Sequence, residues 1–285
     1  MNKFPVCYIN GKFVPMSVAK IPVDKAGVLR GYGVFESVRA TGDATFMLPR
    51  YLKRLRKSAQ LLGLKVPLTD AEIETVVSKL IKINKFPLSK IRIVLTGGKL
   101  IGNLALDNKS SDFFILVWPR QILPIIFYSK GIKLITNEYA REIPEAKSNN
   151  YLLAISLEPK KLKAKAYEIL YTWQGSVLEC STSNFFIIKK NKLITAKDNV
   201  LKGVTRELVM KSAKKISVAV EERNVSVAEL GVADEAFITA TYKGIVPVVK
   251  IDGAKIGNGK VGPVTKLLMS LHNPTLAKPT PPKHP

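Results

Sequence analysis

The chain has 285 residues, enough for two domains of about 100 to 200 residues each. Hydrophobic residues make up 46% and charged residues 24%, and no stretch approaches the roughly 18 apolar residues of a membrane helix, so we expect a globular, cytoplasmic protein. The net charge of +23 raises the alternative of a nucleic-acid-binding protein, but the lysines are spread along the chain without a nucleic-acid-binding motif, which favours a solvated basic surface.

Alternating strand and helix patterns predict a small α/β domain over residues 1–118. Asn10-Gly11, between two alternating runs, is typical of a two-residue hairpin turn. Two later segments have apolar residues at helical spacing, and Thr69 or Asp70 is placed to cap the second. The predicted elements are a hairpin over Cys7–Pro15, strands over Gly33–Ala40, Lys90–Thr96 and Phe113–Trp118, and helices over Pro49–Leu62 and Asp70–Ile83.

A connector over residues 119–126, which contains two prolines, is expected to lead to a larger second domain over residues 127–272. Three turn dipeptides there, Gln174-Gly175, Lys190-Asn191 and Asp252-Gly253, separate adjacent strand-like runs, which predicts a mostly antiparallel sheet rich in hairpins. The predicted strands are Lys133–Thr136, Tyr167–Trp173, Asn184–Ile188, Lys192–Thr195, Ser217–Glu221, Glu235–Thr239 and Val246–Ile251, and the predicted helices are Tyr151–Leu157, Val204–Lys215 and Val261–Leu271. Residues 273–285 are rich in proline and lysine and are expected to be a disordered tail.

The cysteines and histidines exclude several kinds of catalytic site. Cys7 and Cys180 are far apart and lack C-x-x-C spacing, so we expect neither a disulfide framework nor a metal site. His272 and His284 are the only histidines and lie near the C-terminal end, which argues against a Ser-His or Cys-His nucleophile.

Three segments could carry other chemistry. Lys147 precedes a polar run and a predicted helix, although a surface lysine is the ordinary alternative. Gly203 to Thr205 begin a predicted helix whose backbone N–H groups suit a phosphate, although an ordinary helix cap would use the same residues. Glu179 lies in a strand pattern that predicts burial; its cationic partner is either a protonated ring nitrogen of a cofactor or a neighbouring Arg or Lys.

Taken together, these segments resemble the class IV (branched-chain and D-amino acid) aminotransferases, in order and spacing from about Ile9 to Leu271. The motifs that carry the resemblance are Leu29–Arg39, Leu52–Leu55 with Ser58-Ala59, Lys147–Leu152, Leu178–Phe185, Gly203–Arg206, Ala233–Phe237 and Gly262–Thr265. Several ordered motifs in one chain are far more specific than any one of them. The resemblance implies a two-domain enzyme of fold type IV, dependent on pyridoxal 5'-phosphate and at least homodimeric.

The resemblance also implies roles for individual residues. Lys147 would bind the cofactor covalently and then act as general base and acid, and Glu179 would keep the pyridine nitrogen protonated. The other residues implied to bind the cofactor are Arg54, Val204, Thr205 and Thr241 at the phosphate and Tyr151 at the ring hydroxyl. Pro159 interrupts a segment that the family keeps helical, so we expect the helix to be shortened or kinked there.

The identity of the substrate is left open between related activities. The implied substrate-binding residues are Arg30, Phe35, Arg92, Tyr242 and Lys243. A branched-chain amino acid aminotransferase that uses the 2-oxoglutarate/glutamate pair stands first. Arg30, which could clamp a carboxylate, favours a D-amino acid aminotransferase, and an aminodeoxychorismate lyase shares the fold and cofactor residues. Lys243 either adds positive charge near the substrate or faces solvent, and Arg92 is either part of the carboxylate entrance or a structural strand residue.

Overall fold

The computed structural model describes residues 5–273. The chain divides into two compact units, one formed by Met1–Gln121 with Glu145–Tyr151 and the other by Ile122–Pro144 with Leu152–Pro285. Residues 145–151 therefore group with the first unit, although sequence patterning placed them in the second domain. Within the described residues, no helix is long and apolar enough to span a membrane.

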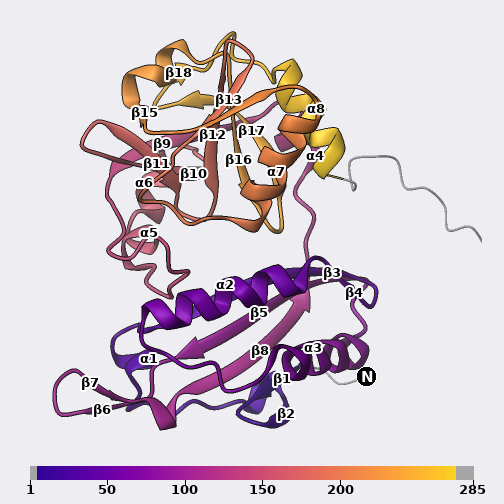
Figure 1. Cartoon of the computed structure of the whole chain (residues 1–285), viewed down its shortest axis with the longest axis vertical. Coiled ribbons are helices and arrows are strands. Elements are labelled where there is room, and N and C mark those ends of the chain that lie inside the picture. The colour runs from indigo at the N-terminus through magenta and orange to yellow at the C-terminus, as the bar shows by residue number, and fades with distance from the viewer. Residues whose placement is uncertain (1–4, 274–285) are drawn as a thin grey trace, which may run out of the picture. The chain divides into compact units, whose positions relative to one another are not determined.

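The first unit is built on a six-stranded antiparallel sheet in the order β2-β1-β8-β5-β3-β4 (Figure 1). Helix α2 packs against β3, and α3 packs against β1 and β8. Its strands are β1 (Val6–Ile9), β2 (Lys12–Pro15), β3 (Gly33–Thr41), β4 (Ala44–Thr45), β5 (Leu88–Thr96) and β8 (Asp112–Pro119), with a separate hairpin of β6 (Lys99–Ile101) and β7 (Ala105–Asp107). Its α-helices are α1 (Ala26–Leu29), α2 (Leu48–Leu61) and α3 (Asp70–Asn84), and its short 3-10 helices are η1 (Met16–Val18) and η2 (Asn108–Ser110).

Local sequence explains the main elements of this unit. Asn10 and Gly11 both have positive φ, as a two-residue hairpin turn requires, and the predicted hairpin is confirmed. Thr69 and Glu72 form a reciprocal capping box at the start of α3. The buried face of α2 includes Tyr51, Leu52, Leu55 and Ala59, at the spacing that predicted the helix.

The second unit is built on a ten-stranded sheet in the order β14-β13-β12-β16-β17-β9-β10-β11-β15, with β18 beside β17. Most pairings are antiparallel, but β9 runs parallel to β10 and β17, and β13 parallel to β14. The strands are β9 (Ile132–Glu138), β10 (Glu168–Trp173), β11 (Ser176–Cys180), β12 (Asn184–Lys189), β13 (Lys192–Thr195), β14 (Ala219–Glu222), β15 (Val225–Ser226), β16 (Glu235–Ala240), β17 (Gly244–Ile251) and β18 (Ala254–Lys255).

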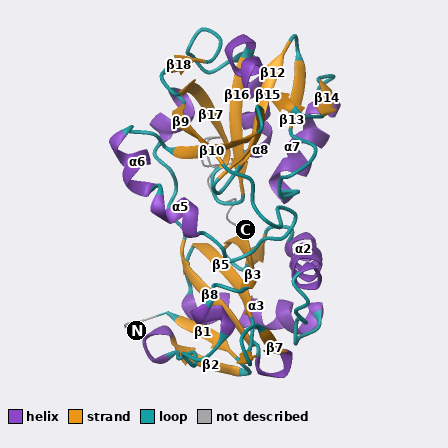
Figure 2. Cartoon of the chain, turned by 90° about the vertical axis from the view of Figure 1, so that its left-hand side faces the viewer, coloured by secondary structure: helices purple, strands orange, loops and turns teal. Residues whose placement is uncertain are grey.

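The helices of the second unit are α4 (Ile125–Ser129), α5 (Leu152–Ser156), α6 (Glu158–Lys163), α7 (Val204–Lys215) and α8 (Pro263–His272), with the 3-10 helix η3 (Val227–Val232). The three helices predicted for this unit correspond to α5, α7 and α8, and α4 and α6 were not predicted. Figure 2 shows α5, α6, α7 and α8 beside the strands of the sheet. The expected break at Pro159 is confirmed: α5 ends at Ser156, and Pro159 lies in the first turn of α6, where no backbone N–H is needed. The expected disordered tail lies, apart from Asn273, outside the described residues.

Candidate functional site

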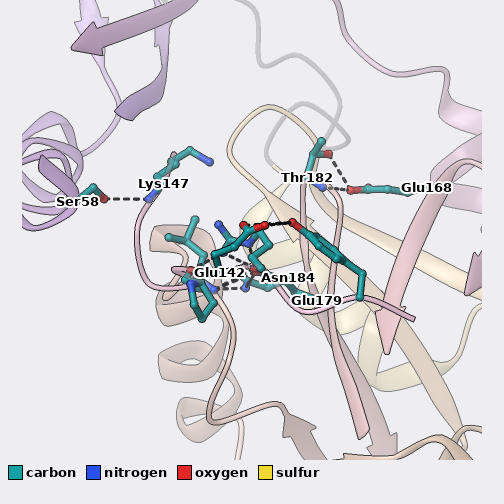
Figure 3. A network of polar contacts seen from close by, with 11 residues as sticks. Ser58, Glu142, Lys147, Glu168, Glu179, Thr182 and Asn184 are labelled. Atoms are coloured by element: carbon teal, nitrogen blue, oxygen red, sulfur yellow. Dashed lines mark hydrogen bonds and ion pairs between the residues drawn. The ribbon is translucent and has the colours of Figure 1, made fainter. Parts of the chain in front are cut away.

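The backbone of Lys147 is fixed within the first unit by β3 and α2. The Lys147 carbonyl accepts a hydrogen bond from the Phe35 amide at 2.9 Å, and the Asn149 amide donates to Gly33 at 2.9 Å. The Lys147 amide donates to Ser58 Oγ on α2 at 3.1 Å (Figure 3). A Cβ on Gly33 would lie 2.7 Å from the Asn149 side chain, so this close approach requires glycine. A short polar segment is thus held on a rigid strand and helix.

Phe35 is the centre of the side chains around Lys147. Phe35 is 5% exposed; Lys147 Nζ lies 4.6 Å from its ring centroid, and Arg92 Cζ lies 4.8 Å from that centroid. Tyr151 packs beside it, with ring centroids 5.9 Å apart. The structure therefore brings together four of the residues predicted from the sequence. Burial, and after it the charge of Arg92, lowers the pKa of nearby Lys90.

Arg54 makes a bidentate ion pair with a buried carboxylate. Its Nε lies 2.7 Å from Glu36 Oε1 and its Nη2 lies 2.8 Å from Glu36 Oε2, and the Glu36 side chain is fully buried. Because a fork of two hydrogen bonds fixes the guanidinium plane, Arg54 is held in one orientation on α2, one turn before Ser58. Glu36 was not predicted as a partner of Arg54, although it lies inside the motif Leu29–Arg39.

The contacts of Arg30 do not include the side chains around Phe35. It is the exposed C-cap of α1, and its Nη1 donates to the adjacent Leu29 carbonyl at 3.0 Å. Its role as a carboxylate clamp stays a prediction.

Glu179, in the second unit, is a buried carboxylate at the centre of a polar network. Its Oε1 accepts hydrogen bonds from Arg141 Nε at 3.1 Å and Nη2 at 2.6 Å. Its Oε2 accepts a hydrogen bond from Asn184 at 3.0 Å (Figure 3). The Leu201 amide is shared between both oxygens at 3.1 Å. The sequence left the cationic partner of Glu179 open, and Arg141 is one such partner in the structure. No sequence signal singled out Arg141.

Asn184 connects this carboxylate to the start of α7. Its Nδ2 also donates to the Leu201 carbonyl at 2.7 Å, two residues before the N-cap Gly203. A Cβ on Gly203 would lie 2.1 Å from Asn184 Oδ1, so the two segments approach as closely as glycine allows. Gly203 has no side chain to cap the amides of Val204 and Thr205, which leaves the helix start suited to an anion.

Arg206, in the same first turn, points away from such an anion. Its Nη2 donates to Ala196 O at 2.9 Å and to Glu222 at 2.7 Å, and the residue is 3% exposed. Burial raises the pKa of Glu222, but the hydrogen bond and charge of Arg206 outweigh it, so the pKa lies below the ordinary value.

Thr241, Tyr242 and Lys243 form the turn between β16 and β17. Lys243 does not face solvent, which was one of the two alternatives: its side chain is 14% exposed, and its Nζ lies 2.7 Å from the buried Glu168. Glu168 was not predicted as a site residue, because nothing in its local sequence pattern distinguishes it from other strand residues.

The comparisons with known proteins identify the family. The protein family described as "Amino-transferase class IV" matches residues 33–251 of this chain. The chain is 37% identical to a protein of Methanocaldococcus jannaschii described provisionally as a branched-chain-amino-acid aminotransferase, over 92% of this chain and 93% of that one. It is 29% identical to a D-alanine aminotransferase of Bacillus licheniformis, over 90% of this chain and 92% of that one. The chain therefore belongs to the class IV aminotransferases.

Solved structures agree with this assignment and with the expected two-domain fold. A branched-chain amino acid aminotransferase of Escherichia coli superposes with a TM-score of 0.87 at 26% identity, covering 94% of this chain and 93% of that one. A second branched-chain amino acid aminotransferase, solved with pyridoxamine 5'-phosphate, superposes with a TM-score of 0.89 at 29% identity. The match covers 96% of this chain and 94% of that one. The chain is thus a transaminase of fold type IV, a class whose members depend on pyridoxal phosphate.

Proposed function

We propose that this chain binds pyridoxal 5'-phosphate through Lys147 and transfers the amino group of a branched-chain amino acid to a 2-oxo acid. The observation that carries the proposal is the fixed position of Lys147, whose backbone is held by Phe35 and Ser58 while its amine rests over the Phe35 ring. A catalytic lysine must reach the same point in every turnover, and this arrangement provides such rigidity.

The residues present suit this cofactor. At the uncapped start of α7, Val204 and Thr205 offer amides and a hydroxyl to its phosphate. Glu179 is proposed as the partner of the protonated ring nitrogen, which would join the Arg141 and Asn184 donors at this carboxylate. Arg54 and Thr241 are proposed as further phosphate ligands, and Tyr151 as the partner of the ring hydroxyl.

The bound cofactor supplies an electron-withdrawing ring for charge that develops at the substrate Cα. The chain supplies the remaining chemistry. The amine of Lys147 would take the proton from the substrate Cα as a general base and would then donate it to cofactor C4′ as a general acid. Glu179, oriented by Arg141 and Asn184, keeps negative charge at the ring nitrogen.

A D-amino acid substrate is the second candidate. Relatives bear both names, and the identity to the M. jannaschii protein, 37%, exceeds that to the B. licheniformis enzyme, 29%. The exposed position of Arg30, with its guanidinium against its own backbone, gives the D-amino acid alternative less support than its sequence position suggested. The branched-chain proposal therefore stays first.

The first experiment is an absorbance spectrum of the purified protein, repeated after adding L-leucine and, separately, D-alanine without an oxo acid. L-leucine is expected to bleach the visible band of the lysine-bound cofactor and D-alanine to leave it. Bleaching by D-alanine alone would replace the branched-chain proposal, and release of pyruvate from aminodeoxychorismate would indicate the lyase.

The variant that tests the role of Lys147 is Lys147→Ala. It should lose the band of the lysine-bound cofactor and all turnover, because the amine that binds the cofactor and moves the Cα proton is removed. Lys57→Ala is the matched control, since Lys57 lies on α2 in an exposed ion pair with Glu145. Near-normal turnover by Lys147→Ala would refute the proposed function.

A further inference from the structure

Glu168, the first residue of β10, holds the turn that connects β11 to β12. Its side chain is 4% exposed. Its Oε1 accepts hydrogen bonds from the Thr182 amide at 2.5 Å and hydroxyl at 2.8 Å (Figure 3). Its Oε2 accepts from the Ser183 hydroxyl at 2.9 Å. This turn, residues 181–183, directly follows the strand that carries Glu179.

The same carboxylate also holds the turn formed by residues 241–243. Lys243 Nζ donates to Glu168 Oε2 at 2.7 Å and to Thr182 Oγ1 at 3.1 Å. The Lys243 carbonyl in turn accepts a hydrogen bond from the Tyr128 hydroxyl at 2.9 Å. One buried ion pair therefore joins two turns that lie 61 residues apart, measured from Thr182 to Lys243.

Both groups are held in their charged forms. Burial raises the pKa of Glu168, but the charge and hydrogen bond of Lys243 and the hydrogen bonds from Thr182 outweigh it, and the pKa lies below its ordinary value. Burial likewise lowers the pKa of Lys243, but Glu168 outweighs it and the pKa is raised. The pair is thus ionised across the neutral range.

We propose that Glu168 and Lys243 are positioning residues that fix the 241–243 turn against the 181–183 turn, and that Lys243 acts through Glu168 rather than by contact with the substrate carboxylate. Tyr242 and Lys243, which the family resemblance implies in substrate binding, both lie in the 241–243 turn. The inference rests on the proposed function, which places Thr241 at the cofactor phosphate.

Contact between Lys243 and a substrate carboxylate is disfavoured by its surroundings. Its ammonium already donates to Glu168 and Thr182, and it lies 5.0 Å from the centroid of the Tyr167 ring. A substrate carboxylate that drew the ammonium away would leave Glu168 buried without its cation, which is strongly unfavourable.

The test uses the double variant Glu168→Gln/Lys243→Met, which removes both charges, keeps similar volumes and leaves an amide oxygen for Thr182. In the half-reaction with donor and no oxo acid, the donor dissociation constant should rise about tenfold. The rate constant should change by less than about twofold, since Arg141 and Asn184 still orient Glu179. In the cofactor-free protein, hydrogen exchange of the Thr182 amide should be faster.

The control is Lys192→Met/Glu221→Gln, which removes the same charges from an exposed pair of 2.7 Å in the same unit. It should leave donor binding unchanged. An unchanged donor dissociation constant in the Glu168/Lys243 double variant would overturn the inference, as would an equal rise in the control. If wild-type protein carries out the half-reaction, such a failure leaves the proposed function intact.

If the double variant does not fold, Thr182→Val decides the question. This substitution keeps the ion pair and removes the hydroxyl that contacts both of its members. Donor affinity should weaken about threefold; wild-type affinity would overturn the inference.

Discussion

At the scale of single residues, the sequence motifs single out candidate functional groups, but not the partners that these groups have in the folded chain. Lys147 and Glu179 were predicted from their motifs. Arg141 and Glu168 were not, because ion pairs join residues that the chain brings together only on folding: Arg141 lies 38 residues from Glu179, and Lys243 lies 75 from Glu168. The spacing of a motif contains no information about such contacts.

The ion pair of Glu229 with Arg223 gives a prediction for stability against pH. Arg223 donates to both Glu229 oxygens, at 2.8 and 3.0 Å, and this hydrogen bonding, against a smaller effect of burial, lowers the Glu229 pKa to about 2. A carboxyl whose pKa is lower in the folded state stabilises the fold above its unfolded pKa, about 4.3, and loses that contribution as the pH falls towards 2.

Glu229→Gln should therefore lower the free energy of unfolding at pH 7 by about 1 kcal/mol, a value limited by solvent screening near the surface. The difference from wild type should shrink between about pH 4.3 and 2, where the wild-type carboxyl also becomes neutral. Urea denaturation at several pH values measures it. A difference that stays constant down to about pH 2 would contradict the assigned cause.

At the scale of elements, periodicity predicted those that are long or bounded by strong turn signals. Helix α7 was predicted at both ends, and the turns at Gln174-Gly175, Lys190-Asn191 and Asp252-Gly253 are confirmed by positive φ at each residue. The β6–β7 hairpin and α4 were missed, because three-residue strands and a five-residue helix are too short to show a period. Parallel pairing of β9 was also missed, since pairing partners are set by the whole sheet.

Gly203 tests the junction between α7 and the carboxylate network. Its φ of −68° suits any residue, so Gly203→Ala acts through the added Cβ, which would displace Asn184. The cofactor dissociation constant should rise by about tenfold, because Asn184 orients Glu179 and the helix start together. Titration of the apoenzyme with cofactor measures it.

The matched control is Gly231→Ala, where an added Cβ meets no atom within 4 Å. It should bind cofactor as wild type does. Equal cofactor affinity in the two variants would show that the Asn184 contact is not needed.

At the scale of the whole molecule, the grouping of residues 145–151 with the first unit depends on contacts that the sequence pattern does not reveal. Val34 and Ser148 form an isolated β-bridge although many residues separate them. The order of elements along the chain therefore suggests two continuous domains, whereas each compact unit is built from two separate stretches of the chain.

The predicted oligomer also belongs to this scale. By its resemblance to the family we expect at least a homodimer, with a mass of about twice the 31.5 kDa of one chain. Light scattering of the protein at its assay concentration measures this mass. A monomer with full transaminase activity would contradict the expectation.

The two cysteines have a practical consequence. Cys7 and Cys180 are 0% and 3% exposed, and burial raises the pKa of both thiols. The folded protein should therefore react slowly with thiol reagents at neutral pH. A cysteine introduced at an exposed site in each unit would then be the only fast-labelling position there, so a pair of dyes could report the spacing of the two units in solution without removal of a native residue.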